Sequence, residues 1–290
     1  MSGCQRETND KGEKMTPKKI GNAVYVTPEM QFGDGSVLFG YRGSVTHGTY
    51  IPSTDPGSID DIDLIGVFVA PIEYYFGLKK AKTVEKWVGV YDMVFYEIGH
   101  YFSLLLKNNP NVLSLLFLKP EHYIHVSELG QRIIANRNIF ISKNVFFSYT
   151  GYARGQLKKI EKYNREGYMG EKRKALVEKN GYDTKNAAHL IRLLRQGTET
   201  LGTGRIEVNR KDASELLSIK NGEWDLEEVK ECAQKLFKQA ELAFGESHLP
   251  DNPDYEKVSE LLIGILRDFH YESEAVRKTR QLKEEAKMIK

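Results

Sequence analysis

The sequence predicts an α+β protein with a small mixed β-sheet in its first half and an all-helical second half. Short apolar segments bounded by glycine, proline and asparagine are typical of strands, and they are confined to about residues 37–96. From about residue 126 onward the apolar residues recur at helical spacing instead. Strands that come first and helices that come later indicate a sheet followed by a helical part, rather than an alternating α/β fold.

Four segments follow from this division. Residues 1–20 contain almost no apolar side chains, so we expect a disordered N-terminal segment. The sheet-containing domain is expected over residues 21–125 and the helical domain over residues 126–275. Residues 276–290 are rich in Lys and Glu and predict a charged, frayed C-terminal tail.

Composition indicates a soluble cytoplasmic protein. The chain has 290 residues and a formal net charge of +2, which gives no global electrostatic argument for nucleic-acid binding. Its two cysteines, Cys4 and Cys232, form neither a disulfide framework nor a zinc motif. No apolar run is as long as a membrane span, and residues 1–19 lack the apolar centre of a signal peptide, so we expect no membrane contact.

The first half is predicted to contain four strands. Glycines precede the first strand, and a loop rich in turn residues, Thr46–Ser58, separates it from the second. Pro71 follows the second strand. The expected strands are Val37–Tyr41, Asp61–Val69, Thr83–Val90 and Tyr91–Tyr96.

Helices are predicted from apolar periodicity and from capping residues. Asn109 and Pro110 are a good N-cap and first residue for a short helix that is apolar nearly all round and therefore buried. Asp183 is expected to cap a helix that ends before Gly202. The expected helices are Glu97–Lys107, Asn111–Leu118, Ser142–Lys162, Asp183–Leu201, Asp225–Phe244 (opened by a capping box of Asp225 and Glu228) and Pro253–Phe269.

The helix Asp183–Leu201 has an apolar stripe and a polar side. The apolar stripe consists of Ala187, Leu190, Ile191, Leu194 and Leu201. The polar side consists of Lys185, His189, Arg192, Gln196 and Glu199. Such a side is most often solvated, but its basic residues could instead contact phosphate or another part of a substrate.

Two carboxylates stand at the start of the second predicted strand, some way after a glycine-serine turn. Because side chains alternate along a strand, Asp61 and Asp63 point to one side while Ile62 points into a core. Paired carboxylates can bind a divalent cation. The turn Gly43-Ser44 offers a backbone N–H and a hydroxyl to a phosphate. This combination predicts metal-assisted phosphoryl or nucleotidyl transfer.

A basic stretch lies in the helical half. Residues 151–180 hold nine Lys/Arg and four Glu, with Tyr152, Tyr163 and Tyr168 among them. Positive charge with interleaved aromatic rings could follow a nucleic-acid backbone. The same composition is also typical of an exposed helix with Lys/Glu pairs, so both interpretations stay open.

Gly43-Ser44 followed by Asp61-Ile62-Asp63 resembles the signature of the polymerase-β-type nucleotidyltransferase superfamily. Three segments resemble, more narrowly, the predicted nucleotidyltransferases named after an RNA-repair-pathway DNA polymerase β. These segments are GSVTHGTYIPSTDPGSIDDIDLIGVFV, DMVFYEIGHYFSLLLKNNPNVLSLLF and KNAAHLIRLLRQGTETLGTG, and with the weaker GYARGQLKK they span roughly residues 38–225. One departure is that sixteen residues separate Ser44 from Asp61, which leaves Asp60 as an alternative to Asp61 in the metal pair. The strand phase favours Asp61 with Asp63.

The resemblance implies a nucleotidyltransferase catalytic domain in residues 21–125, in which Asp61 and Asp63 hold two Mg²⁺ (or Mn²⁺) ions. It also implies a third carboxylate on a neighbouring strand. Asp92, in the apolar setting YDMVFY, fits that place; Glu97 is the alternative, although the start of a helix favours an acid there in any case. The residues expected to contact the nucleotide phosphates are Gly43, Ser44, Arg42, His47, Lys185 and Arg192, although Arg42 could equally be a strand residue that points outward.

The implied function is transfer of a nucleoside monophosphate from an NTP, ATP among them, to a hydroxyl on an RNA end, a small molecule or a protein. The alternative is a catalytically idle regulator that binds nucleotide or nucleic acid on the same scaffold. A hydrolase or phosphotransferase that uses the same metals is a third, less favoured hypothesis. Three mutually repelling carboxylates are costly without a cation, which favours the enzyme over the idle regulator.

Overall fold

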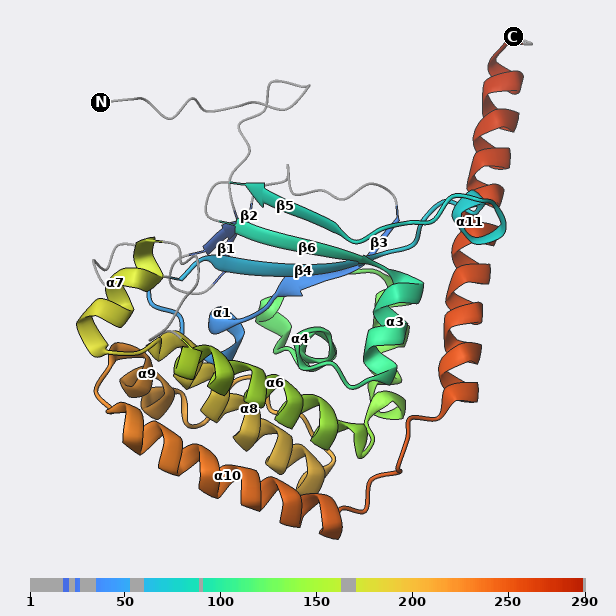
Figure 1. The fold of residues 1–290 in the computed structure, drawn as a ribbon. Helices are drawn as coiled ribbons and strands as arrows, with labels where there is room; N and C mark the ends of the chain where they lie inside the picture. The colour runs from blue at the N-terminus through green and yellow to red at the C-terminus, as the bar shows by residue number, and fades with distance from the viewer. Residues whose placement is uncertain are drawn as a thin grey trace, which may run out of the picture.

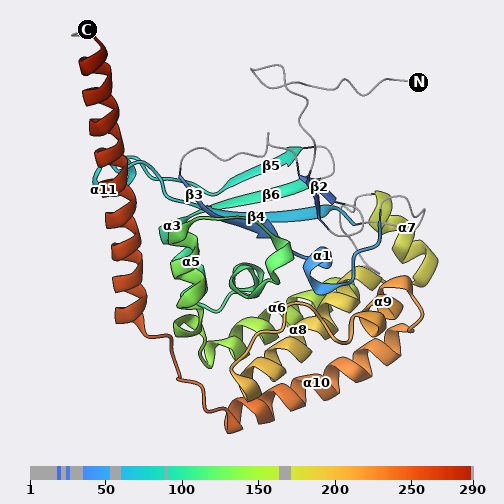
Figure 2. The ribbon, with the colours of Figure 1, turned by 180° about the vertical axis from the view of Figure 1, so that it is seen from behind.

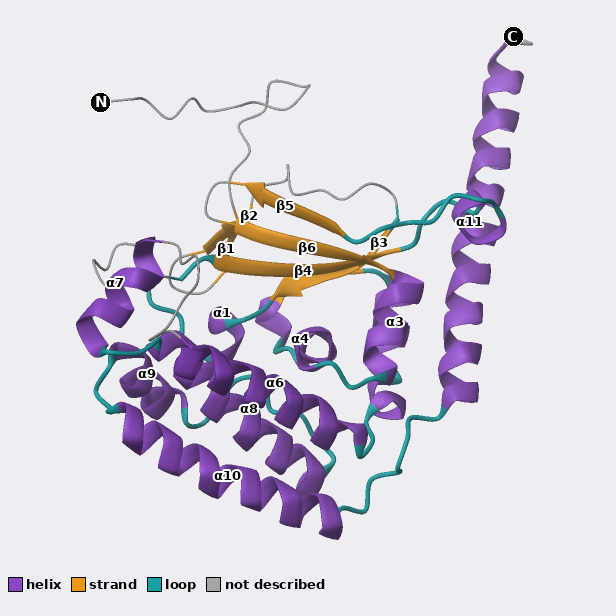
Figure 3. Ribbon diagram, in the orientation of Figure 1, coloured by secondary structure: helices purple, strands orange, loops and turns teal. Residues whose placement is uncertain are grey.

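A computed structural model of the chain describes residues 18–20, 24–26, 35–52, 60–88, 91–162 and 171–288. Parts of five expected features lie outside these residues: residues 1–17 of the N-terminal segment, residues 53–58 of the turn-rich loop, residues 89–90 of the third predicted strand, Tyr163 and Tyr168 of the basic stretch, and residues 289–290 of the C-terminal tail. The described residues form a five-stranded sheet, with most of the helices on one side of it (Figures 1 and 3). The predicted α+β class is therefore confirmed.

The sheet has the strand order β5-β6-β4-β3-β7. Its strands are β3 (Ser36–Tyr41), β4 (Ile62–Phe68), β5 (Val84–Val88), β6 (Tyr91–Glu97) and β7 (Tyr123–Val126). β4 and β6 are parallel and the other pairs are antiparallel, so the sheet is mixed as predicted. The four predicted strands are present, whereas the edge strand β7 was not predicted. A separate antiparallel ribbon pairs β1 (Lys18–Ile20), within the segment expected to be disordered, with β2 (Val24–Val26).

The two faces of the sheet have different neighbours. On β4, Ile62 and Leu64 belong to a small apolar cluster of the sheet itself. Ile65 and Val67 belong to the main core, which includes residues of the helices. Because side chains alternate along a strand, Asp63 lies on the same side as Ile65 and Val67. The helix-covered side of the sheet is therefore the side that carries the predicted carboxylates.

Three helices begin where the sequence places their caps, whereas the helices predicted from Ser142 and Pro253 begin two residues later, at Asn144 and Tyr255. The side chain of Asn109 accepts a hydrogen bond from the N–H of Asn111, and that of Asp183 accepts one from Asn186. Asp225 and Glu228 form the predicted capping box. The helices are α1 (Ser44–His47), α2 (Glu73–Phe76), α3 (Ile98–Leu106), α4 (Pro110–Leu113), α5 (Glu128–Ala135), α6 (Asn144–Lys162), α7 (Glu171–Asn180), α8 (Thr184–Thr203), α9 (Ala213–Asn221), α10 (Leu226–Glu246) and α11 (Tyr255–Met288).

Helix α8 is the centre of the helical half and packs against α6, α9 and α10. All five residues of its predicted apolar stripe are buried. Its polar side is not solvated as a whole, because Arg192 and Gln196 are buried too. α8 therefore has neighbours on both sides, and its basic residues lie between the helical half and the sheet.

Helix α11 is longer than predicted. The sequence predicts its end near Phe269, whereas the helix continues to Met288. Residues 265–290 contain no glycine or proline and many Lys, Glu and Arg, which are good helix formers, so no local signal ends the helix. Seen from the front and from behind, its C-terminal half extends past the edge of the sheet (Figures 1 and 2). Among the described helices, none is both long and apolar enough to cross a membrane.

Candidate active site

A cleft of about 290 Å³ lies between the sheet half and the helical half of the chain. Its lining comes from the end of β3, from α1, from β4, from α4 and the turn after it, and from α8 and α9. Seven of the predicted site residues line it: Arg42, Gly43, Ser44, His47, Asp63, Lys185 and Arg192. Residues from the two predicted domains thus meet at one place.

Two features of position 43, its backbone conformation and the closeness of a neighbouring side chain, require a glycine there. Gly43 has a φ of 68°, a region that favours glycine, and directly precedes α1. A Cβ atom at this position would lie 2.5 Å from Oδ2 of Asp63. The turn is therefore packed directly against the carboxylate. This contact brings the predicted phosphate-binding turn next to the predicted metal ligand.

Two of the predicted carboxylates are neighbours across the parallel strand pair. Asp63 on β4 is in register with Asp92 on β6, so both side chains point to the same face. Both also lie near one guanidinium: Nη2 of Arg42 is 3.6 Å from Oδ1 of Asp63 and 3.4 Å from Oδ2 of Asp92. Asp61, directly before β4, acts electrostatically on Asp63. The strand register therefore brings Asp63 and Asp92 together beside Arg42, whereas Asp61 precedes β4, and of these three acids Asp63 is the one that lines the cleft.

The surroundings of Asp63 disfavour the ionised form of its carboxyl group. Burial raises the pKa of Asp63 above its ordinary value, and the negative charges of Asp92 and Asp61 raise it further. The positive charges of Arg42 and Lys185 act in the opposite direction but do not cancel these effects. A carboxylate in this setting is stabilised by an additional cation.

The donor set fits a hard divalent cation. Carboxylate oxygens are the ligands that Mg²⁺ and Mn²⁺ prefer, and here two adjacent strands turn such oxygens toward one positive group. Within the described part of the chain, no group of three His, Cys, Asp or Glu side chains is gathered closely enough to hold an ion as it stands. Arg42 instead lies beside two of the acids.

Glu97, the alternative third carboxylate, lies at the other end of β6. It pairs with Phe68 at the far end of β4, whereas Asp92 pairs with Asp63. Its carboxylate caps α3 by accepting hydrogen bonds from the N–H groups of Gly99 (2.8 Å) and His100 (3.0 Å). This is the ordinary structural use of an acid at a helix start. Asp92 is therefore the third carboxylate that we retain in the proposed site.

Asp60, the alternative to Asp61, has different partners altogether. Its buried carboxylate accepts a hydrogen bond from the N–H of Ile51 (2.9 Å) and forms ion pairs with Lys220 and Lys185, the latter at 3.3 Å. Nζ of Lys220 also donates to the carbonyl of Thr49 (2.8 Å). Asp60 thus joins the segment before β4 to α8 and α9, and it fixes two lysines that line the cleft.

Replacing Asp60 by asparagine is expected to destabilise the protein by about 3–5 kcal/mol, because two lysines would lose their buried counter-ion. Urea unfolding of Asp60→Asn, Lys220→Met and the double variant measures the coupling between the two sites. The pair Lys143–Asp251, whose aspartate side chain is 84% exposed, serves as the matched control, with an expected coupling below about 1 kcal/mol. Equal coupling energies for the two pairs would contradict the anchoring role of Asp60.

Arg192 is a buried positive charge whose guanidinium bonds to an amide rather than to a carboxylate. Its guanidinium donates to Oε1 of Gln196 (2.8 Å), and among the described residues no carboxylate lies within ion-pair distance of it. Burial lowers its pKa to about 10, so it remains charged at pH 7. Gln196 is itself held by donating to the carbonyl of Glu207 (2.9 Å). A buried cation that lines a cleft and lacks a counter-ion is suited to bind an anion.

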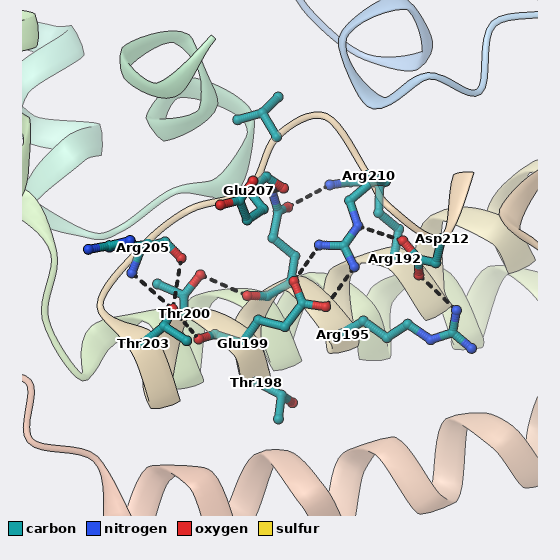
Figure 4. A network of polar contacts seen from close by, with 12 residues as sticks. Arg192, Arg195, Thr198, Glu199, Thr200, Thr203, Arg205, Glu207, Arg210 and Asp212 are labelled. Atoms are coloured by element: carbon teal, nitrogen blue, oxygen red, sulfur yellow. Dashed lines mark hydrogen bonds and ion pairs between the residues drawn. The ribbon is translucent and has the colours of Figure 1, made fainter. Parts of the chain in front are cut away.

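Two other arginines near α8, Arg195 and Arg210, are paired with carboxylates (Figure 4). Arg210 forms two hydrogen bonds with Glu199 (2.6 and 2.8 Å) and one with Asp212 (2.9 Å). Arg195 bonds to Asp212 (2.7 Å) and twice to Glu215 (2.8 and 2.9 Å). These bonds hold the loop after α8 against the helix. The contrast with Arg192 indicates that the missing counter-ion is specific to the cleft.

His47 is neutral at pH 7. Burial lowers its pKa first of all, and the positive charge of Arg192 lowers it further. Its Nδ1 lies 3.0 Å from the carbonyl oxygen of Val208, which can only accept, so Nδ1 carries the proton and donates. The ring then offers Nε2 as an acceptor. The predicted contact of His47 with phosphate therefore requires the ring to take up a proton.

Several lining residues were missed by the sequence analysis. These are Thr49, Pro110, Asn111, Ser114, Ala188, Leu216 and Lys220. Pro110 and Asn111 carry a local signal, the Asn109-Pro110 helix start, but this signal predicts a helix cap and not a cleft. Lys220 has no local signal, because its partner Asp60 is 160 residues away in the sequence.

Comparison with known proteins identifies a family for this chain. The model of the RNA repair pathway DNA polymerase beta family matches residues 36–264. Among solved structures, a nucleotidyltransferase-like protein from Exiguobacterium sibiricum 255-15 is 9% identical, with 81% of this chain and 75% of that chain covered and a TM-score of 0.26. A likeness at that level says nothing about the site. No curated protein matches this chain.

Proposed function

The chain belongs to the RNA repair pathway DNA polymerase beta family, and we propose that it is a metal-dependent nucleotidyltransferase. It would move a nucleoside monophosphate from an NTP to a hydroxyl acceptor. One observation carries the proposal: one wall of a single cleft carries Asp63, with Asp92 beside it on the next strand, and the other wall carries the buried Arg192, which has no carboxylate counter-ion among the described residues. These are the charges needed to hold a cation and a polyphosphate side by side.

The carboxylate wall would hold the metal. Asp63 and Asp92 are adjacent on the parallel strands, and Asp61 is close enough to act on Asp63. Mg²⁺ or Mn²⁺ held there would neutralise the triphosphate and lower the pKa of the attacking hydroxyl. Gly43 lets the backbone approach the phosphates, and Ser44 offers a hydroxyl beside them.

The cationic wall would hold the leaving group. Transfer forms a bond from the acceptor oxygen to the α-phosphorus and breaks the bond to the bridging oxygen, so pyrophosphate leaves with the negative charge. Arg192 and Lys185 project from α8 into the same cleft and supply positive charge for it. Asp60 keeps Lys185 in place at 3.3 Å. These side chains come from the helical half, so in the proposed reaction the sheet half would hold the metal and the helical half would hold the leaving pyrophosphate.

The same scaffold could also serve as an idle regulator that binds a nucleotide without transferring it. The arrangement of the acids favours the enzyme. Asp63 and Asp92 stand in register, and the raised pKa of Asp63 reflects the cost of this repulsion in the metal-free chain. A protein that only bound the phosphates would need the cationic wall alone.

RNA is one class of acceptor that we propose. Arg154, Lys158 and Lys159 are on α6, which lies beside the cleft: Nδ2 of Asn109, next to the lining residue Pro110, donates to the hydroxyl of Tyr152 on α6 (2.9 Å). A basic helix with a tyrosine near the cleft fits a single-stranded backbone. Small molecules and proteins remain the other acceptor classes.

An assay of label transfer tests the proposal. The chain is incubated with each α-³²P-labelled NTP, with Mg²⁺ or Mn²⁺, and with separate pools of RNA, DNA, protein and small hydroxyl compounds. Transfer by the wild type that is absent with chelator and in Asp61→Asn/Asp63→Asn supports the enzyme. Binding of an NTP without transfer to any pool would favour the idle regulator, and the absence of both would refute the proposed function.

A further inference from the structure

Arg42 occupies an unusual place for a residue of a catalytic cleft. It directly follows β3, and its backbone N–H donates to the carbonyl of Asp63 (2.9 Å), which fixes its position beside β4. Its side chain is about three-quarters buried, with Nη2 between the carboxylates of Asp63 and Asp92. Arg42 therefore stands among the acids to which we assign the metal.

The contacts that Arg42 makes there are weak. Its two carboxylate contacts, at 3.6 and 3.4 Å, are longer than the roughly 2.7–2.9 Å of a good charge-assisted hydrogen bond. Its Nε is buried, and no acceptor among the described residues bonds to it. Arg195 and Arg210, by contrast, each make three bonds of 2.6 to 2.9 Å to carboxylates. Arg42 is thus close to two acids without being well bound by either.

We propose that Arg42 is a built-in counter-ion that takes the place of the divalent cation in the metal-free protein and passes to the nucleotide phosphates when the cation binds. This inference rests on the proposed function. A guanidinium and a dication beside the same two carboxylates repel each other, so one must leave. Arg42 also lines the cleft with Gly43 and Ser44, so phosphate oxygens would be within its reach.

The exchange makes metal and nucleotide binding depend on each other. Without nucleotide, the cation must displace Arg42 from the two carboxylates with which Arg42 forms ion pairs, and this cost weakens metal binding. With nucleotide, the displaced guanidinium gains phosphate partners. Metal and nucleotide should therefore bind cooperatively, and Arg42 should carry much of the coupling.

Titration of Mn²⁺ followed by electron paramagnetic resonance tests this on the full chain, with and without a non-hydrolysable NTP analogue. Arg42→Met removes the guanidinium and is expected to bind Mn²⁺ about 10-fold more tightly than the wild type without nucleotide. The analogue should tighten Mn²⁺ binding to the wild type but not to Arg42→Met. Arg42→Lys, which keeps the charge, and Arg267→Met, an exposed arginine, should resemble the wild type.

A second measurement uses the wild-type protein, so the test does not depend on whether Arg42→Met folds. In ¹⁵N-arginine-labelled protein, the Arg42 Nε resonance, identified by its absence in Arg42→Lys, should shift when Mg²⁺ is added. Suppose that Mn²⁺ binding depends on Asp63 but is equally tight in the wild type and in Arg42→Met, and that the Arg42 Nε resonance does not shift. This result would overturn the counter-ion role and leave the proposed function standing. Mn²⁺ binding that survives unchanged in Asp63→Asn, or that is absent throughout, would overturn both.

Discussion

Asp63→Asn is expected to lower the rate of nucleotidyl transfer by at least about 10³-fold, because it removes a central ligand of the proposed metal site. The same change is expected to raise the stability of the metal-free protein. The folded chain holds the Asp63 proton more tightly than the unfolded chain does, since burial and the nearby acids raise its pKa. The contribution of Asp63 to stability is therefore fully present only below the unfolded pKa, and it is lost as the pH rises through the raised folded value.

Thermal unfolding of the metal-free wild type and of Asp63→Asn between pH 4 and pH 8 measures this effect. The variant should have the higher Tm at pH 7, and the difference should shrink toward the ordinary carboxyl pKa of 3.8. Added Mg²⁺ should raise the Tm of the wild type alone. A variant that is less stable than the wild type at pH 7 without metal would contradict the account of Asp63 as a strained carboxylate.

Asp92→Asn and Glu97→Gln are the matched pair that separates the two possible third carboxylates. Asp92 stands in register with Asp63, so Asp92→Asn should lose transfer to a similar degree. Glu97 caps α3, so Glu97→Gln should lower stability by about 1 kcal/mol and leave transfer nearly intact. Loss of transfer in Glu97→Gln alone would reverse the assignment.

Local patterns predicted the parts of the fold that depend on neighbouring residues. The alternation of β4 places Ile62 in an apolar cluster and Asp63 on the helix-covered side, as its period of two requires. The capping side chains of Asn109 and Asp183 accept hydrogen bonds from residues only two or three positions further along the chain. The strand β7 was missed because it is short and its partner β3 lies some 85 residues earlier in the chain.

The cleft could be predicted only in part, because the polar side of α8 has two physical meanings. Lys185 and Arg192 at helical spacing are typical both of a solvated side and of a cleft wall. Only the fold distinguishes them, by burying Arg192 without a carboxylate partner among the described residues. The pairing of Asp60 with Lys220 likewise depends on the approach of segments 160 residues apart, for which the sequence holds no local signal.

Arg192→Met is expected to lower transfer by about 10²-fold while leaving the protein as stable as the wild type or more so. The loss follows because the cleft would keep Lys185 but lose its buried guanidinium as a partner for the leaving phosphates. The gain in stability follows because burial lowers the pKa of Arg192 to about 10, which means that folding disfavours its charge. Calorimetry with pyrophosphate should show binding to the wild type that is weakened in the variant.

Arg195→Met provides the opposite pattern on the same helix. Arg195 is three residues further along, is paired with Asp212 and Glu215, and does not line the cleft. Its loss should destabilise the protein by about 1–3 kcal/mol and leave pyrophosphate affinity nearly unchanged. If both variants lost stability and pyrophosphate binding to the same extent, the helix would be acting as a structural unit and the anion site at Arg192 would be refuted. Weakened pyrophosphate binding in Arg192→Met but not in Arg195→Met would assign the anion site to Arg192, which has no carboxylate partner among the described residues.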